Sequence, residues 1–149
     1  PAKQSWKQIG NRSVIVFLTV CTKAREPILG DAETHDLLVK AWEKADSWVV
    51  GRYVILPDHV HLFASPHDSD SPDVAQWVSY WKSLVTRQWS GRRVRSIWQR
   101  DFWDRQLRSG ESYAQKWEYV RSNPVRHGLV QAADDWPFQG KLNDLAWHD

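Results

Sequence analysis

Hydrophobic and polar positions along the chain follow two different periods. A period of two, rich in β-branched and aromatic residues, is typical of strands, and a period near 3.6 is typical of amphipathic helices. These periods predict strands at residues 13–22, 48–56, 59–65 and, as one bent strand or a hairpin, 97–107, and helices at residues 31–46, 71–89 and 112–121. The resulting βαββαβα order predicts a ferredoxin-like α+β domain, with helices packed on one mainly antiparallel sheet.

Capping and turn residues predict where these elements begin and end. Asp31 is expected to cap the first helix, and Ser71, which precedes a proline, to cap the second. The Pro-Asp pair at residues 57–58 predicts a tight connection between two strands. The Asn-Pro pair at residues 123–124 predicts the end of the third helix, because proline disfavours helix at the residue before it.

Length and composition indicate one globular domain over residues 1–149, with a core at about 13–130 and an acidic tail at 131–149. The longest apolar run, residues 14–20, is far shorter than the roughly 20 residues of a membrane helix. The first ten residues are polar and predict no secretory signal. Cys21 is the single cysteine, which excludes an internal disulfide framework and fits a reducing cytoplasm. We therefore expect a cytoplasmic protein without a membrane partner.

Charge is unevenly distributed, although the net charge is only +2. Between Lys82 and Arg108, eight basic residues face two acidic ones, so this stretch carries +6 and the rest of the chain −4. Several aromatic residues are interleaved with the arginines. Arginine binds phosphate and aromatic rings stack on unpaired bases, so a nucleic-acid surface is one interpretation. A solvated arginine-rich face above core aromatics is the other, and charge alone does not choose between them.

The segment His59-Val60-His61 is the first candidate for chemistry. On a strand, residues i and i+2 point to the same face, so two imidazoles placed in this way can converge on one metal ion. Val60 would point to the opposite face, into the core. Taken alone the pair is a weak signal, because two histidines on a half-exposed strand often have no function.

Tyr119 and Asn123 form the second candidate pair. Their i, i+4 spacing places both side chains on one helix face. An amide oxygen is a hard ligand that suits Mg²⁺ or Mn²⁺. The alternative is that Tyr119 is a core aromatic and Asn123 only marks the end of the helix.

Three segments together resemble the REP-associated tyrosine transposases, relatives of the single-tyrosine HUH transposases of insertion sequences. They are YVILPDHVHLFAS (residues 53–65), WQRDFWDRQLRS (residues 98–109) and YVRSNPVRHGLV (residues 119–130). The resemblance extends from about residue 14 to residue 130. Asn123 followed by proline favours the REP-associated branch, since the insertion-sequence branch typically has glutamine there. Leu56 and Asp58 stand where the family usually has methionine and asparagine, and neither is a ligand.

The resemblance implies an enzyme that cleaves and rejoins single-stranded DNA beside hairpins of repetitive extragenic palindromes. His59, His61 and Asn123 would bind Mg²⁺ or Mn²⁺, and Tyr119 would attack phosphorus, giving a 5′-phosphotyrosine and a free 3′-hydroxyl. The partner would be hairpin-bearing single-stranded DNA, the protein would be a monomer or a homodimer, and the location would be the bacterial cytoplasm, at the nucleoid.

DNA contacts are expected from basic and aromatic residues near the predicted loops: Lys82, Arg87, Arg92, Arg93, Arg95, Arg12, Lys23, Arg25, Trp89 and Trp103. Tyr113 lacks an asparagine four residues on and is expected to point away from Tyr119. Tyr53 and Tyr80 are expected to be packing residues. The other histidines, His35, His67, His127 and His148, are expected at the surface or bonded locally, and Asp58 and Asp104 are candidates to orient the metal ligands.

Two further hypotheses remain open at this point. One is a domesticated protein that binds DNA hairpins without cleaving them. The other is an unrelated metal hydrolase, or a purely structural ferredoxin-like module. The acidic tail either covers the site, in which case its removal would speed cleavage, or packs elsewhere.

Overall fold

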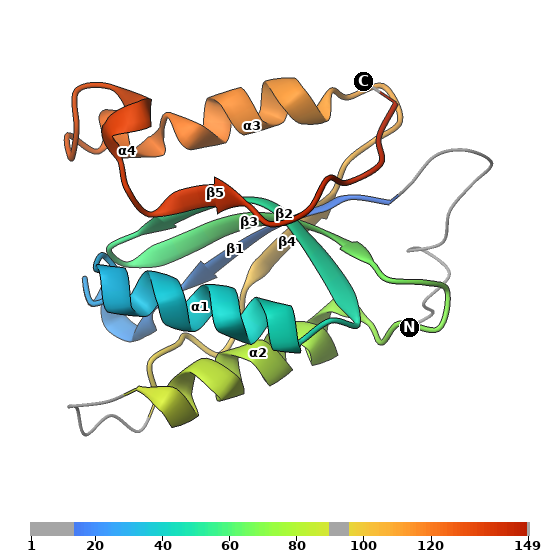
Figure 1. Cartoon of the computed structure of the whole chain (residues 1–149), viewed down its shortest axis with the longest axis horizontal. Helices are drawn as coiled ribbons and strands as arrows, with labels where there is room; N and C mark the ends of the chain where they lie inside the picture. The colour runs from blue at the N-terminus through green and yellow to red at the C-terminus, as the bar shows by residue number, and fades with distance from the viewer. Residues whose placement is uncertain (1–13, 90–95, 149) are drawn as a thin grey trace.

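A five-stranded antiparallel sheet with the strand order β4-β1-β3-β2-β5 forms the centre of the computed structural model (Figure 1). The structure describes residues 14–89 and 96–148. The strands are β1 (Val16–Cys21), β2 (Trp48–Leu56), β3 (His59–Pro66), β4 (Trp103–Gln106) and β5 (Gln139–Lys141). The helices are α1 (Ala32–Lys44), α2 (Val74–Gln88), α3 (Tyr113–Arg121) and α4 (Asn123–Arg126), with 3-10 turns η2 (Lys23–Arg25) and η3 (Ala133–Asp135).

The predicted α+β class and the βαββαβα order are confirmed, and β5 is added after them. The predicted strand at residues 97–107 is too long. Only Trp103–Gln106 pairs with β1 as a strand, and Trp98 makes an isolated bridge to Thr22. Ile97 and Trp98 are buried instead, so the apolar character of this segment reflects packing rather than strand pairing.

α1 and α2 cover one face of the sheet (Figure 1). Val60, Leu62 and Ala64 of β3 point to this face and belong to the larger hydrophobic cluster. Five of the ten tryptophans in the described residues are buried here: Trp42, Trp48, Trp77, Trp81 and Trp98. Their rings touch one another in edge-on or stacked pairs 5.5–6.1 Å apart, so these tryptophans serve the core.

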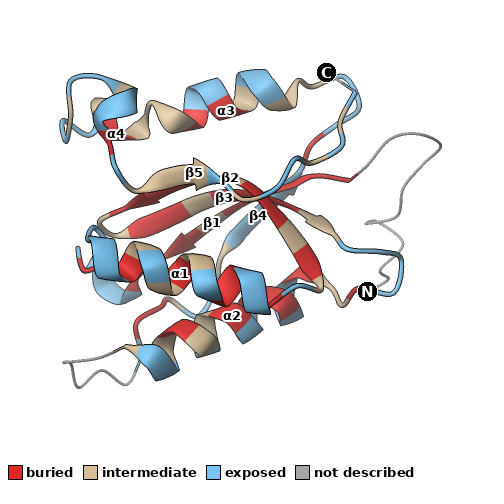
Figure 2. Cartoon of the chain, viewed as in Figure 1, coloured by how far each residue is buried: buried red, intermediate tan, exposed pale blue. Residues whose placement is uncertain are grey.

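α3 covers the opposite face of the sheet, where a smaller cluster forms. Phe63 of β3, Trp117 and Val120 of α3 and Trp136 of the C-terminal segment are buried there (Figure 2). β3 therefore sends alternate side chains into two cores, as strand geometry requires. The same alternation directs His59 and His61 to the α3 face, as the sequence predicts.

The predicted caps are correct at one helix and wrong at another. Asp31 caps α1, because its carboxylate accepts a hydrogen bond from the Thr34 amide at 2.8 Å. α2 is capped by Asp73 rather than Ser71: the Asp73 carboxylate accepts from the Gln76 amide at 2.9 Å. Ser71 is buried in the preceding turn and accepts there from the Asp68 amide at 3.0 Å.

α3 ends at Arg121, as predicted, but the Asn-Pro pair that follows begins a further short helix. Ser122 keeps helical dihedral angles, and α4 begins at Asn123 with Pro124 in its first turn. Proline is tolerated there because the first amides of a helix have no partner within it. The chain leaves the helical path at Gly128, whose φ of 72° lies in the left-handed region.

The C-terminal segment packs into the fold more regularly than its sequence suggests. β5 pairs with β2, with Tyr53 opposite Gly140. Trp136 is 9% exposed, and its indole donates to the Ile55 carbonyl at 2.9 Å. The tail therefore extends the sheet. In the described part of the chain, no helix combines the length and apolar character needed to cross a membrane.

Candidate active site

The two histidines of β3 lie side by side on the sheet face covered by α3. His59 is 6% exposed, and its ring centroid lies 4.7 Å from that of His61. His61 stacks on Phe17 of β1, and its Nδ1 lies 2.9 Å from the Thr19 hydroxyl. The Nδ1 of His59 lies 2.7 Å from the Asp58 carboxylate.

The carboxylate partner of His59 determines which of its ring nitrogens carries the proton. A carboxylate only accepts, so at 2.7 Å Nδ1 of His59 carries the proton, and the 3.4 Å approach of the Arg25 guanidinium to that nitrogen is not a hydrogen bond. Within residues 14–89 and 96–148, Nε2 of neither ring has a hydrogen bond. Each ring therefore keeps one nitrogen for another partner.

Burial keeps both imidazoles neutral. It lowers the pKa of His61 to about 3, helped by the positive charges of its neighbours. It also lowers the pKa of His59, although the hydrogen bond and charge of Asp58 act in the opposite direction. A neutral imidazole has the lone pair that a metal ion needs.

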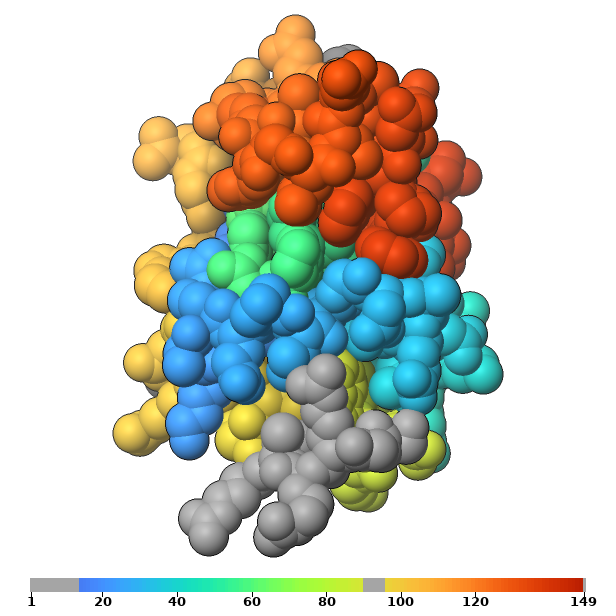
Figure 3. All heavy atoms as spheres, turned by 90° about the vertical axis from the view of Figure 1, so that its left-hand side faces the viewer, coloured from blue at the N-terminus to red at the C-terminus, as the bar shows by residue number. Residues whose placement is uncertain are grey.

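Tyr119 lies at the C-terminal end of α3 and is 68% exposed. It lines a cavity of about 410 Å³ together with His61 and Asn123. Phe17, Phe63, Leu107 and Val120 supply apolar walls, and Arg105, Lys116 and Arg126 supply cations. The predicted tyrosine, one predicted histidine and the predicted amide thus meet in one cavity, and His59 adjoins it through its contact with His61. Figure 3 shows the end of the molecule where the β2–β3 turn lies between the segment after β1 and the helices α3 and α4.

The cavity lining has no carboxylate, and its cations differ in their partners. Arg105 and Lys116 both pair with Glu111, at 2.8 Å and 3.0 Å. Arg126 has no ion pair within the described residues. It donates instead to the Asn123 side-chain oxygen at 2.9 Å and to the Tyr119 carbonyl at 3.0 Å. The cavity therefore suits an anion such as a phosphate group.

Sequence reasoning missed Arg126 and placed His127 among unremarkable surface histidines. His127 is exposed, yet its ring lies edge-on to His59 with centroids 6.0 Å apart. Arg126 is three residues after Asn123 and seven after Tyr119, a spacing that puts all three on one side of a helix. This spacing is the sequence pattern that could have identified Arg126 as a residue of the site.

The donor atoms of His59, His61 and Asn123 are suited to bind a divalent metal ion. His59 binds a carboxylate through its proximal nitrogen, the arrangement that orients metal-bound histidines, and His61 binds a hydroxyl in the same way. Asn123 would add a hard oxygen ligand. No three His, Cys, Asp or Glu side chains converge on a metal site within the described residues, so a site here would require the amide. Asp104, the other predicted orienting carboxylate, is exposed on β4 and has no hydrogen bond to either histidine.

A second basic groove, which we call the α2 groove, has a volume of about 600 Å³. It is lined by Lys23, Ser79, Lys82, Ser83, Thr86, Ser96, Trp98, Gln99 and Arg100. Lys82 is half-buried, and its ammonium donates to the Gln99 carbonyl at 2.8 Å. Burial lowers the pKa of Lys82, and Asp101 opposes this effect. Within the described residues, Lys23 and Arg100 have no ion pair.

The remaining DNA-contact candidates occupy varied positions. Arg87 is exposed on α2, and Arg25 pairs with Asp58 at 3.0 Å. Trp89 packs against the larger core cluster, which favours a packing role. Trp103 is 61% exposed on the edge strand β4. Four further candidates lie outside the described residues: Arg12, Arg92, Arg93 and Arg95.

The other tyrosines are placed elsewhere. The Tyr113 hydroxyl accepts from the Arg52 amide at 2.9 Å, and its close approach requires glycine at position 51, where a Cβ would lie 2.5 Å from that oxygen. Tyr113 therefore points away from the cavity, as predicted. Tyr53 is buried, as predicted, but the prediction for Tyr80 is wrong: it is 43% exposed.

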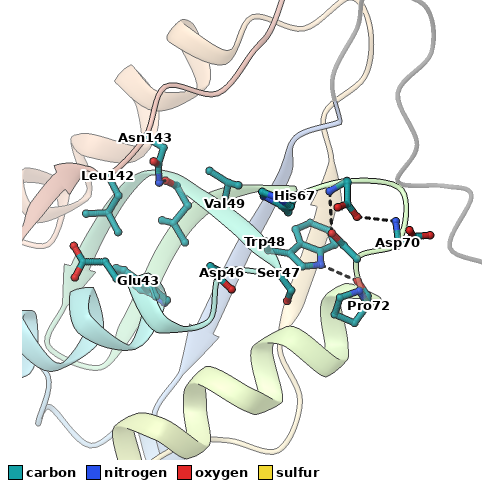
Figure 4. A pocket seen from close by; sticks show the side chains of 14 residues that line it. Glu43, Asp46, Ser47, Trp48, Val49, His67, Asp70, Pro72, Leu142 and Asn143 are labelled. Atoms are coloured by element: carbon teal, nitrogen blue, oxygen red, sulfur yellow. Dashed lines mark hydrogen bonds between the residues drawn. The ribbon is translucent and has the colours of Figure 1, made fainter.

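Another cavity, of about 650 Å³, lies at the opposite end of β3 (Figure 4). Its rim includes Glu43, Asp46, Asp70 and His67, and the Trp48 indole donates to the Pro72 carbonyl at 2.8 Å. Four carboxylates and no lysine or arginine line it, which disfavours phosphate. We therefore assign the candidate chemistry to the smaller cavity at Tyr119.

Comparisons with known proteins were made by family model, sequence and structure. No family model matches the chain. A candidate REP-associated tyrosine transposase of Haemophilus influenzae is 33% identical over 102 residues, which cover 61% of this chain and 57% of that protein. The REP-associated tyrosine transposase of Escherichia coli is 30% identical over 98 residues, 65% of this chain and 56% of that protein. The chain thus matches just over half the length of these curated relatives.

Two solved structures are similar in fold. A REP-associated tyrosine transposase bound to a REP hairpin superimposes with a TM-score of 0.72 at 25% identity, over 90% of this chain and 80% of that one. A candidate transposase of Deinococcus radiodurans has a TM-score of 0.51 at 19% identity, over 78% and 95% of the two chains, and supports the fold alone. The predicted resemblance is confirmed: in sequence and in fold, the chain is related to the REP-associated tyrosine transposases.

Proposed function

We propose that this relative of the REP-associated tyrosine transposases is a single-strand DNA transesterase that acts beside DNA hairpins. One observation carries the proposal: Tyr119, His61 and Asn123 line one cavity that contains three cations and no carboxylate. A candidate nucleophile, two candidate metal ligands and a cationic lining thus lie close together, which supports the proposal. The hairpin bound to the similar solved structure supports the choice of substrate.

In the proposed reaction, the Tyr119 hydroxyl oxygen attacks phosphorus as it loses its proton. The bond from phosphorus to the 3′ oxygen breaks, and that oxygen leaves as a 3′-hydroxyl after taking up a proton. The DNA remains attached as a 5′-phosphotyrosine. Because one phosphoester replaces another, a second 3′-hydroxyl can reverse the step and join two strands.

His59, His61 and Asn123 would hold a Mg²⁺ or Mn²⁺ ion, which when bound polarises a non-bridging phosphate oxygen as a Lewis acid. The protein's own contribution is orientation. Asp58 and Thr19 hold the two rings through their Nδ1 atoms, and burial keeps the rings neutral. Phe17 packs against His61 and fixes its plane.

A path for the DNA strand follows from the positions of the basic residues around β4. Arg100 lines the α2 groove and Arg105 lines the Tyr119 cavity, and the exposed Trp103 lies between these two arginines in the sequence. Trp103 pairs with Thr19, the partner of His61, so the indole shares the cavity's face of the sheet. We place the sugar–phosphate backbone along this edge, with one unpaired base stacked on Trp103.

The test is covalent adduct formation on a hairpin oligonucleotide with a single-stranded flank, in Mg²⁺ or Mn²⁺. The unmodified protein should form an adduct that denaturing electrophoresis retains and that peptide mapping locates at Tyr119. Tyr119→Phe should abolish the adduct, because the ring remains but the attacking oxygen is gone. Tyr80→Phe, which removes an exposed hydroxyl on α2, is the matched control and should leave the adduct intact.

The other outcomes separate the alternatives. An adduct that survives Tyr119→Phe, or maps to Tyr113, would show that the nucleophile is misassigned. Tight retention of the hairpin with no adduct in either metal would favour a hairpin-binding protein that no longer cleaves. Equal binding of hairpin and plain duplex would favour an unrelated hydrolase or a structural module. Sedimentation of the DNA complex distinguishes monomer from homodimer.

A further inference from the structure

Arg126 contacts both candidate functional groups on the helical side of the cavity. Its Nη2 donates to the Asn123 side-chain oxygen at 2.9 Å, and its Nη1 donates to the Tyr119 carbonyl at 3.0 Å and also bonds the Ser122 hydroxyl. The guanidinium carbon lies 4.2 Å from the centroid of the Tyr119 ring. One planar group thus lies over the ring of Tyr119 and bonds the amide of Asn123.

The carboxamide of Asn123 is fixed at both ends. Its oxygen accepts from Arg126, and its nitrogen donates to the Val120 carbonyl at 2.9 Å. A flip of the carboxamide would place its NH₂ against the guanidinium donors and its oxygen against a carbonyl oxygen. The network therefore determines which end carries the oxygen, and Arg126 is the donor that selects it.

Arg126 differs from the other cations of the cavity, because no carboxylate within the described residues pairs with it. Arg105 and Lys116 share Glu111. An arginine with no counter-ion, held by two carbonyl-type oxygens and an aromatic face, contributes through its fork geometry. A lysine would supply the charge but not the two parallel donors or the flat face.

We propose that Arg126 is a positioning residue that holds the Tyr119 ring and the Asn123 oxygen in one arrangement for metal-assisted attack. The inference rests on the proposed function, because it takes Asn123 as a metal ligand and Tyr119 as the group that attacks the DNA phosphate. In this role Arg126 contacts neither the Tyr119 hydroxyl oxygen nor the phosphorus. It acts by holding the side chains of Tyr119 and Asn123. Removing the fork while keeping the charge should release the amide and the ring together.

Arg126→Lys is the decisive variant, because it retains the positive charge beside the metal site. Calorimetric titration with Mn²⁺ alone should show affinity weakened about tenfold, the usual effect of losing a group that orients a metal ligand. At saturating metal and hairpin DNA, adduct formation should slow by about tenfold or more. Hairpin affinity should stay within about twofold, because lysine keeps the positive charge on which phosphate binding depends.

Arg121→Lys is the matched control. Arg121 lies on the same helix but pairs with Glu118 and Asp134 and does not line the cavity. It should match the unmodified protein in Mn²⁺ affinity and rate. Thermal unfolding of both variants checks that the fold is retained.

Each result decides between roles. Unchanged Mn²⁺ affinity and rate in Arg126→Lys would overturn the proposal, since charge alone would suffice. Weaker hairpin binding at an unchanged saturated rate would make Arg126 a phosphate-binding residue and would also overturn it. If the unmodified protein forms no adduct and binds no Mn²⁺, both the proposed function and the inference are wrong. If the unmodified protein is active and Arg126→Lys changes neither Mn²⁺ affinity nor rate, only the inference is wrong.

Discussion

His35 shows how a half-buried histidine makes the stability of the fold depend on pH. Its Nε2 lies 2.7 Å from the Tyr53 hydroxyl, and burial lowers its pKa, with Asp36 opposing the shift. In the unfolded chain, the pKa of His35 would be about 6.5. As the pH falls below that value, the unfolded state takes up a proton that folded His35 resists, so the folded state loses stability.

His35→Gln should therefore flatten the fall in stability below about pH 6.5, because a residue that cannot titrate no longer contributes to it. Urea unfolding of the metal-free protein at several pH values measures this, as the difference between the two curves. His67→Gln, at an exposed position, is the control. Parallel curves for His35→Gln and the unmodified protein would contradict the assignment.

At the scale of elements, α3, α4 and the C-terminal segment complete the second face of the sheet. β5 extends the sheet beside β2, and Trp136 fills the space between the segment and the smaller cluster. None of residues 131–148 lines the Tyr119 cavity. This placement does not support a tail that covers the cavity. It supports the alternative, in which the tail packs against the sheet.

Trp136→Ala should lower the free energy of unfolding by about 3–5 kcal/mol, the usual effect of truncating a large buried aromatic residue. The truncation also leaves the Ile55 carbonyl without its donor. Trp103→Ala is the matched control: the side chain is 61% exposed, so the change should be under about 0.5 kcal/mol. Denaturant unfolding measures both variants. A loss in Trp136→Ala as small as that in Trp103→Ala would show that the tail adds little to the stability of the fold.

At the scale of the whole molecule, the small net charge conceals two basic regions at the β4 side of the sheet. The Tyr119 cavity and the α2 groove each carry three cations in their linings and no carboxylate. The cavity with four carboxylates lies at the opposite end of β3. Such segregation directs a polyanion to one side of the molecule.

The double variant Lys23→Gln/Arg100→Gln should weaken hairpin DNA binding. It should also lower the slope of log affinity against log salt by about 2, because each removed cation leaves one phosphate of the DNA with its counter-ions. The rate of adduct formation at saturating DNA should not change, because neither residue lines the Tyr119 cavity. Lys44→Gln, at the end of α1, is the control. An unchanged salt slope in the double variant would place the DNA elsewhere.

The sequence determined the local features of this protein. Its hydrophobic periods predicted the order of the elements through α3, and the alternation along β3 sent Val60 into the core and both histidines to the other face. Helical spacing brought Tyr119 and Asn123 to one cavity. These features follow from the pleat of a strand and the pitch of a helix, which depend on neighbouring residues only.

The tertiary structure alone decided which distant groups meet. Sequence patterns cannot show that Thr19 bonds His61, that Arg25 pairs with Asp58, or that β5 pairs with β2. Nor do they tell the exposed Trp103 from the tryptophans of the core. Such interactions depend on how the chain returns to the sheet, and the physical reason is that burial and charge pairing are set by residues far apart in sequence.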